Sequence, residues 1–222
     1  MDNTQATREK MVRDQIERRG VLDPRVLEAM NVVPRHLFVP AEYRNMAYQD
    51  RPLPIGQDQT ISQPYIVALM TEQLSLKPED IVLEIGTGSG YQAGILSRLV
   101  KQVYTIERFQ PLAQMAKRVL KELRYDNVTV ICQDGSLGLK EHMPFDAILI
   151  GAASPKVPEP LLDQLKIGGR IIVPIGGSGH QILQRMTKGL DGNLETDELI
   201  PVIFVPLRGY YGWHEDDWEN NR

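Results

Sequence analysis

From residue 66 onward, short apolar runs alternate with segments whose apolar residues recur at helical spacing. The short runs are continuously apolar, which is typical of parallel strands covered on both faces. We therefore expect an α/β fold with a mostly parallel, doubly wound sheet and an antiparallel pair among the last strands. The predicted helices span 66–74, 91–99, 110–123 and 159–165, and the predicted strands span 81–85, 102–106, 128–132, 145–150, 169–173, 181–187 and 201–206.

The first third of the chain has a different pattern. Apolar residues gather on one side of segment 11–19, which predicts a helix. Asp23 and Pro24 predict the start of a second helix, with Asp23 as N-cap and Pro24 at the first helical position. The proline-rich stretch 34–64 predicts a long irregular segment, and such segments are often functional in compact domains.

The length of 222 residues fits a single domain with a substantial core. We divide it into N-terminal helices with a substrate and cofactor loop (1–65), an α/β core (66–208) and an acidic tail (209–222). A tail of this composition is expected to be solvated, although its two tryptophans could cover apolar surface.

Charge and cysteine content narrow the function. A net charge of −4 gives no general electrostatic case for binding nucleic acid. The single cysteine, Cys132, cannot form an intrachain disulfide, which suits a reducing compartment. Neither an apolar signal core nor a membrane-length apolar run is present, so we expect a cytoplasmic protein without a membrane partner.

A glycine turn directly after strand 81–85 is the strongest chemical signal. Gly86, Gly88 and Gly90 form a GxGxG pattern between a strand and a helix, an arrangement that brings a nucleotide cofactor against bare backbone. The dinucleotide fingerprint requires glycine or alanine at the next position, where this chain has Tyr91. The departure favours S-adenosyl-L-methionine over NAD.

Acidic residues follow the same strand and the next two. Glu84 lies in the strand before the glycine turn, Glu107 comes directly after the following strand, and Asp134-Gly135 follows the third. Glu107 lies 21 residues beyond Gly86, near the spacing at which an acid meets ribose hydroxyls. Asp134 is suited to accept a hydrogen bond from an adenine amino group.

Each of these features also has a purely structural interpretation. Glycine turns are common, Glu107 could be a solvated acid, and Asp134 could be a turn residue or an N-cap. Their joint placement at three successive strand ends favours the cofactor interpretation.

The chain lacks the sequence motifs of several other enzyme classes. The chain has neither a GxxxxGK[ST] P-loop nor a GxSxG nucleophile elbow. No metal site is expected, because the histidines are scattered and Cys132 has no partner. The histidines are His36, His142, His180 and His214.

Several segments together resemble the protein-L-isoaspartate (D-aspartate) O-methyltransferase family, over roughly residues 11–208. These segments are Val33–Pro40, Gln59–Pro64, Val82–Tyr91, Asp134–Gly135, Phe145–Ala153, Leu165–Pro174 and Val205–Leu207. The resemblance implies a Rossmann-like S-adenosylmethionine-dependent methyltransferase fold, with a seven-stranded mostly parallel sheet, an N-terminal helical extension and a rearranged C-terminal part of the sheet.

The resemblance also implies site residues. Ser62 would be the active-site serine, near the acceptor carboxylate and the methyl donor; its alternative interpretation is an N-cap for the helix after Pro64. The implied cofactor-binding residues are Thr60, Ile61, Gln63, Glu84, Gly86, Gly88, Gly90, Glu107, Asp134 and Gly135. The implied substrate-binding residues are Ser62, Ala152, Ala153 and Leu207.

The implied reaction moves a methyl group from S-adenosyl-L-methionine to the free α-carboxylate of L-isoaspartyl and D-aspartyl residues. The ester then collapses to a succinimide and begins repair of damaged proteins and peptides, the expected partners of a monomeric enzyme. Three alternatives stay open at this point. They are a methyltransferase for RNA or a small metabolite, an NAD-dependent oxidoreductase, and a non-catalytic peptide-binding relative.

Overall fold

The computed structural model describes residues 3–220, and its centre is a seven-stranded sheet in the order β5-β4-β3-β6-β7-β8-β9. The five strands from β5 to β7 pair in parallel, and β8 and β9 add antiparallel pairs at one edge. The predicted doubly wound, mostly parallel sheet is therefore confirmed. The strands are β3 (Ile81–Ile85), β4 (Gln102–Glu107), β5 (Val128–Cys132), β6 (Phe145–Ile150), β7 (Leu165–Gly176), β8 (Gln181–Lys188) and β9 (Leu194–Val202).

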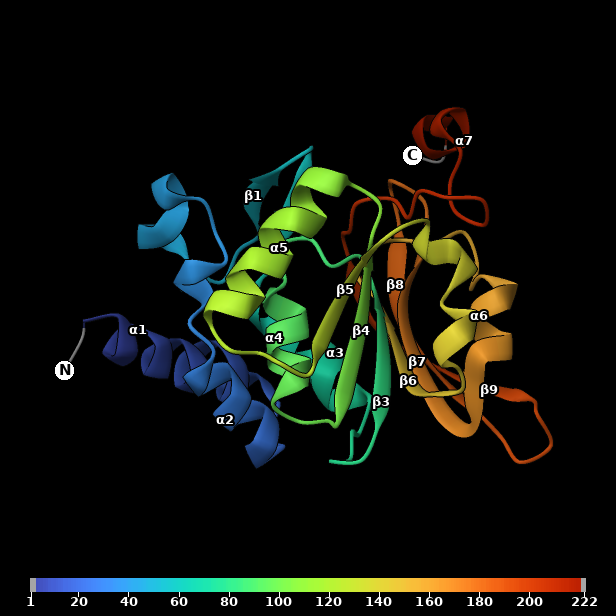
Figure 1. Cartoon of the computed structure of the whole chain (residues 1–222), viewed down its shortest axis with the longest axis horizontal. Coiled ribbons are helices and arrows are strands. Elements are labelled where there is room, and N and C mark those ends of the chain that lie inside the picture. Colours follow the sequence, from blue (N-terminus) through green and yellow to red (C-terminus); the bar gives the residue numbers. More distant parts are fainter. Residues whose placement is uncertain (1–2, 221–222) are drawn as a thin grey trace.

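Helices cover both faces of this sheet (Figure 1). On one side lie α3 (Pro64–Gln73), α4 (Tyr91–Ser97) and α5 (Gln110–Glu122), and on the other lies α6 (Glu159–Gln164). The side chains of successive strand residues point to opposite faces of the sheet. Val82 packs in the core on the face covered by α3, α4 and α5, and Leu83 packs on the face covered by α6. Two buried faces explain why the strands are apolar without alternation.

The N-terminal helices pack against the outside of α3. α1 (Asn3–Met11) continues as a π-helical turn over Val12–Ile16 and a 3₁₀ turn over Glu17–Arg19, so the first helical segment begins eight residues before the predicted start. The extension is polar and exposed, and apolar spacing gives no signal for such a segment. α2 (Pro24–Val32) begins as predicted, because the Asp23 carboxylate accepts a hydrogen bond from the Arg25 N–H at 2.8 Å.

The proline-rich segment is more regular than its sequence predicts. It contains 3₁₀ turns at Arg35–Leu37 and Ala41–Met46, then a hairpin of β1 (Leu53–Gly56) and β2 (Gln59–Ile61). Gln57 and Asp58 make the tight turn, each with φ of 54°. The hairpin places residues 60–63 beside the carboxyl ends of β3 and β6, near Gly86 and Gly151.

The prediction of a last strand over 201–206 was wrong in position. β9 covers Leu194–Val202, and the chain leaves the sheet at Ile203. β9 is an edge strand, and three of its nine residues are exposed acids: Glu195, Asp197 and Glu198. The apolar run at 203–206 instead lines a cleft and meets the segment after β6, through a bridge between Ala153 and Pro206. The last three strands lie side by side in chain order.

After that run the chain turns back over the sheet edge and ends in a short helix, α7 (Glu215–Asn220). Residues 221 and 222 of the predicted acidic tail lie outside the described range. No helix within residues 3–220 has the length and apolarity that a membrane crossing requires.

Candidate active site

The candidate site lies where the sheet changes direction. From β3 the chain winds to β4 and β5 on one side, and to β6 and β7 on the other, which leaves a crevice at the strand carboxyl ends. The glycine turn occupies this crevice: Gly86, Gly88 and Gly90 have φ of 92°, 52° and 88°, a region that only glycine enters without strain. The N–H of Gly86 donates to the Ile106 carbonyl at 2.8 Å, which ties the turn to β4.

Glu107 is held rigidly beside that turn. Its Oε2 accepts from the Gly88 N–H and its Oε1 from the Phe109 N–H, both at 2.9 Å. The side chain is buried at the end of β4 and lines the same pocket as Gly86 and Gly88. Each oxygen keeps an unused lone pair, so the carboxylate is pre-oriented to accept hydrogen bonds from a cis-diol.

Glu84 is a fully buried acid at the carboxyl end of β3. Among residues 3–220 neither carboxylate oxygen has a hydrogen-bond partner, and only 1% of the residue is exposed. Burial raises the pKa of Glu84 to about 8; the nearby Thr105 hydroxyl opposes this rise, and the Glu107 carboxylate adds to it. An unpaired buried acid is costly unless a ligand supplies a charge or donor. The amino group of S-adenosyl-L-methionine is such a donor, so this part of the site fits the cofactor.

The raised pKa makes stability depend on pH. Below the ordinary pKa of 4.5 Glu84 is protonated in both the folded and unfolded chain, whereas between 4.5 and about 8 only the folded chain keeps the proton. The free energy of unfolding should therefore fall with rising pH in this window, by about 1.4 kcal/mol per pH unit from this group.

We expect Glu84→Gln to remove this pH-dependent fall in the free energy of unfolding. Denaturant unfolding of the two ligand-free proteins at about pH 6 and about pH 7.5 measures this. The free energy of unfolding of the variant, relative to that of the wild type, should increase as pH rises. A constant difference between the two proteins at both pH values would contradict the buried, protonated state of Glu84.

Gly135, at the third strand end, lines the pocket, whereas the carboxylate of Asp134 binds other parts of the chain. A Cβ at Gly135 would lie 2.6 Å from Cγ2 of Ile85, so only glycine fits this pocket wall. Asp134 does not line the pocket. Its Oδ1 accepts from the N–H and Oγ of Ser136, and its Oδ2 accepts from the Tyr210 N–H at 2.8 Å. The N-cap interpretation of Asp134 is thus realised, and its contact with adenine stays a prediction.

Ser62 lies at the junction of two cavities. It lines a cleft of about 640 Å³ and also a narrow chamber that Glu84 and Gly86 border. It does not cap α3, because Gln63 holds the N-cap position. The hydroxyl makes no hydrogen bond to the described part of the chain, so it is available to a bound ligand. Thr60 and Ile61 also border the chamber, and Gln63 lines the cleft.

Comparison with known proteins agrees with this geometry. The profile of the protein-L-isoaspartate(D-aspartate) O-methyltransferase family matches residues 6–211. A protein-L-isoaspartate O-methyltransferase of Methanospirillum hungatei is 54% identical over 216 residues, which are 97% of this chain and all of that protein. One of Syntrophus aciditrophicus is 53% identical over 96% of this chain and 99% of its own length.

The chain belongs to this family.

Solved structures support the assignment. One protein-L-isoaspartate O-methyltransferase superposes with a TM-score of 0.84 at 32% identity, covering 92% of this chain and 67% of its own. A second, from Plasmodium falciparum and in complex with S-adenosyl-L-homocysteine, gives 0.80 at 28% identity over 90% and 98% of the two chains. The family's activity is the methylation of isoaspartyl proteins with S-adenosyl-L-methionine, so the predicted activity and methyl donor are confirmed.

Four of the predicted site residues of this methyltransferase lie in surroundings that the sequence did not indicate. Ala152 and Leu207 line the pocket of Gly86 and Glu107 rather than the cleft of Ser62, and their contact with the substrate stays a prediction. Ala153 is fully buried and exchanges backbone hydrogen bonds with segment 205–207. Gly90 faces α5, where a Cβ would lie 3.2 Å from Cδ1 of Leu120, so packing also requires a glycine there, and its contact with the cofactor stays a prediction.

Gly151 is the central residue that sequence reasoning missed. It lines the pocket of Gly86 and Glu107, the chamber and the cleft, and a Cβ there would lie 3.5 Å from the carbonyl oxygens of Ile85 and Gly86. Its position directly after β6, at the switch point, is the signal that could have found it. Arg108, Phe109 and Val205 are further pocket residues that the sequence did not single out.

The rim of the cleft carries a fixed cation. The Arg19 guanidinium lies 3.5 Å above the Tyr65 ring and binds the Asp50 carboxylate at 2.7 Å. Arg19 and Tyr65 both line the cleft, as do His180 and the almost fully exposed Ile203. The wall therefore mixes apolar and polar groups, which suits a peptide backbone with varied side chains.

The start of the C-terminal segment docks on the cofactor side. The Tyr211 N–H donates to Ser136 Oγ at 3.1 Å, alongside the contact between Tyr210 and Asp134. Gly209 has φ of 150°, and a Cβ there would lie 2.1 Å from Asp134 Oδ1. The segment predicted as a solvated tail thus begins as a fixed turn beside the pocket.

Gly209→Ala should therefore push this turn away from Asp134 and disturb Leu207 and Arg208 in the pocket wall. We expect roughly tenfold weaker binding of S-adenosyl-L-methionine by calorimetry. The matched control is Gly192→Ala, where φ is also positive at 82° but no atom lies within 4 Å of the added Cβ. Equal affinities in the two variants would contradict a role for the docked turn.

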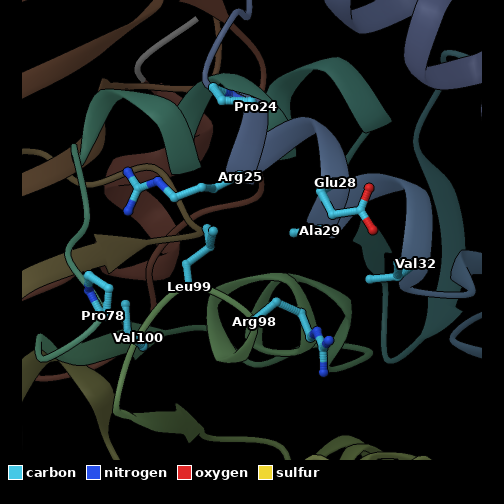
Figure 2. A pocket seen from close by; sticks show the side chains of 9 residues that line it. All are labelled: Pro24, Arg25, Glu28, Ala29, Val32, Pro78, Arg98, Leu99 and Val100. Carbon is cyan, nitrogen blue, oxygen red and sulfur yellow. The ribbon is translucent and has the colours of Figure 1, made fainter.

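A separate pocket of about 440 Å³ lies away from this site (Figure 2). It is lined by α2 and by the residues just before β3 and β4, such as Pro78 and Val100, and so lies near the amino ends of those strands. Ligands of open α/β sheets bind at the carboxyl ends. The pocket contains Arg25, Glu28 and Arg98 but no nucleophile, and we assign it no part in the reaction.

Proposed function

We propose that this enzyme methylates the free α-carboxylate of L-isoaspartyl residues and the free β-carboxylate of D-aspartyl residues, with Ser62 orienting the carboxylate by one hydrogen bond. The observation that carries the proposal is the position of Ser62 between the peptide-sized cleft and the chamber of Glu84 and Gly86. A hydroxyl at this junction can reach an acceptor from the cleft and face a methyl donor in the chamber.

The acceptor needs no activation by a base, because a carboxylic acid is already ionised at neutral pH. Ser62 fits this chemistry, since its hydroxyl has no basic partner within residues 3–220 and can donate to a carboxylate oxygen. When bound, S-adenosyl-L-methionine supplies a methyl group from its sulfonium, whose sulfur keeps the electron pair of the broken bond.

The residues of the chain would hold and align the two reactants. Glu107 would accept hydrogen bonds from ribose, Glu84 would face the amino group, and Gly135 would leave room for the adenine side. Such alignment is the main contribution available when no proton has to move. Partial removal of water would strengthen the attack, because water stabilises a carboxylate more than a charge-dispersed transition state.

The product explains a role in repair. An α-methyl ester is attacked more readily than the free carboxylate, because it carries no negative charge and can expel methoxide. The neighbouring backbone nitrogen can therefore attack the ester carbonyl, and its proton leaves with the methoxide as methanol when the succinimide closes. Hydrolysis of the ring returns some normal aspartate. We propose flexible, damaged segments of many proteins as substrates, because the cleft of about 640 Å³ is open and chemically mixed.

Localisation and assembly complete the proposal. The single cysteine and the net charge of −4 favour a cytoplasmic, monomeric enzyme of one domain that does not act on nucleic acid. A methyltransferase for RNA would be expected to present a basic surface.

Product analysis tests the acceptor atom. An isoaspartyl peptide incubated with enzyme and S-adenosyl-L-methionine should yield a succinimide and then an aspartyl peptide, separable by chromatography. A stable methylated peptide that forms no succinimide would place the methyl group elsewhere and overturn the proposed acceptor.

A further inference from the structure

Arg35 is fully buried in the segment Val33–Pro40, to which the reaction so far assigns no function. Its Nε donates to the Ala47 carbonyl at 2.7 Å, and its Nη2 donates to the Ser62 carbonyl at 2.8 Å. Its Cζ lies 4.9 Å from the centre of the Tyr91 ring. One side chain thus joins the proline-rich segment, the Ser62 loop and the first residue of the helix after the glycine turn.

This placement is costly for stability. Burial lowers the pKa of Arg35 to about 10, so the group is still charged at neutral pH. None of its hydrogen bonds goes to a carboxylate, and Nη1 is buried without a partner among residues 3–220. Buried cations compensated only in part are poor sources of stability, and one use for them is to specify a geometry.

We infer that Arg35 is a positioning residue for methyl transfer, which fixes the backbone of Ser62 relative to the turn that holds the methyl donor. The inference rests on the proposed role of Ser62 and deepens it. The bond from Nη2 sets the Ser62 carbonyl, and contact with Tyr91 sets the distance of the loop from α4. The Ser62 hydroxyl then stands at the junction of cleft and chamber without a hydrogen bond of its own.

Only an arginine can make this connection. The two donors to Ala47 and Ser62 leave the guanidinium from different nitrogens in one plane, while the face of that plane is free for an aromatic ring. A lysine ammonium keeps the charge but is a single point without a planar fork. Arg35→Lys therefore removes the geometry and retains the cation.

We expect Arg35→Lys to lower kcat roughly 10- to 100-fold, because a small misplacement of a reacting group has effects of this size. The KM for S-adenosyl-L-methionine should change less than about twofold, since Arg35 makes no direct hydrogen bond to any of the residues expected to bind the cofactor. Hydrogen–deuterium exchange should rise in peptides covering residues 59–63. The matched control is Arg25→Lys, which also breaks a 2.8 Å bond to a backbone carbonyl, that of Leu76, far from the site, and should keep wild-type kcat.

Outcomes for Arg35 and for Ser62 can be told apart. If Arg35 acts through Ser62, the double variant Arg35→Lys, Ser62→Ala should be no slower than Ser62→Ala alone. Fully multiplicative losses would overturn the inference, as would wild-type kcat and unchanged exchange at residues 59–63 in Arg35→Lys. A wild-type rate in Ser62→Ala would overturn the role of the hydroxyl, while the exchange measurement would still report whether Arg35 fixes the loop.

Discussion

Ser62→Ala should lower turnover roughly 10- to 100-fold, the effect of losing one charge-assisted hydrogen bond of about 1.5–3 kcal/mol in the transition state. Cofactor binding should be nearly intact, because the hydroxyl faces the acceptor rather than the donor. Methyl transfer to an isoaspartyl peptide measures the first quantity, and calorimetry with S-adenosyl-L-methionine measures the second.

A matched serine serves as control for this variant. Ser97 is buried in α4, and its hydroxyl donates only to the Gly94 carbonyl one turn earlier. Ser97→Ala should therefore keep wild-type turnover. Equal losses of turnover and of cofactor affinity in Ser62→Ala would refute the orienting role and would indicate a general disturbance of the loop.

Glu107→Ala should weaken the affinity for S-adenosyl-L-methionine about 100-fold or more, because two hydrogen bonds to an ionised group are lost together. The variant also leaves the N–H groups of Gly88 and Phe109 without their acceptor, which loosens the glycine turn. Calorimetric titration of the ligand-free protein gives the affinity directly.

The control for this prediction is Glu122→Ala, which removes the same side chain from the exposed end of α5. Its affinity should equal that of the wild type. If Glu107→Ala bound the cofactor as tightly as the wild type, the assignment of Glu107 to ribose would be wrong, whatever the rate of methyl transfer.

Local signals explain what the sequence could predict. The apolar run Ile81–Ile85, the glycines after it and Glu107 at the next strand end are short-range features, and parallel pairing alone brings the strand ends together. The fold, the switch point and the cofactor side of the site follow from them. Asp134 lies at the third strand end, as predicted, and its carboxylate binds Ser136 and Tyr210, so its contact with adenine stays a prediction.

Long-range contacts explain what could not be predicted. The run 201–206 is apolar because part of it lines a cleft and meets Ala153, and its sequence looks the same as that of a strand. The contact of Arg35 with the Ser62 carbonyl spans 27 residues and depends on how the proline-rich segment folds. The docking of Tyr210 on Asp134 spans 76 residues. Spacing and composition do not encode such contacts.

The most direct test of the account uses two peptides that differ only in one residue, isoaspartate or aspartate, with S-adenosyl-L-methionine labelled in its methyl group. The account predicts base-labile label on the isoaspartyl peptide alone, because only that linkage presents a free α-carboxylate at the position of the damaged residue. No label on either peptide, with cofactor binding intact, would contradict the proposed acceptor.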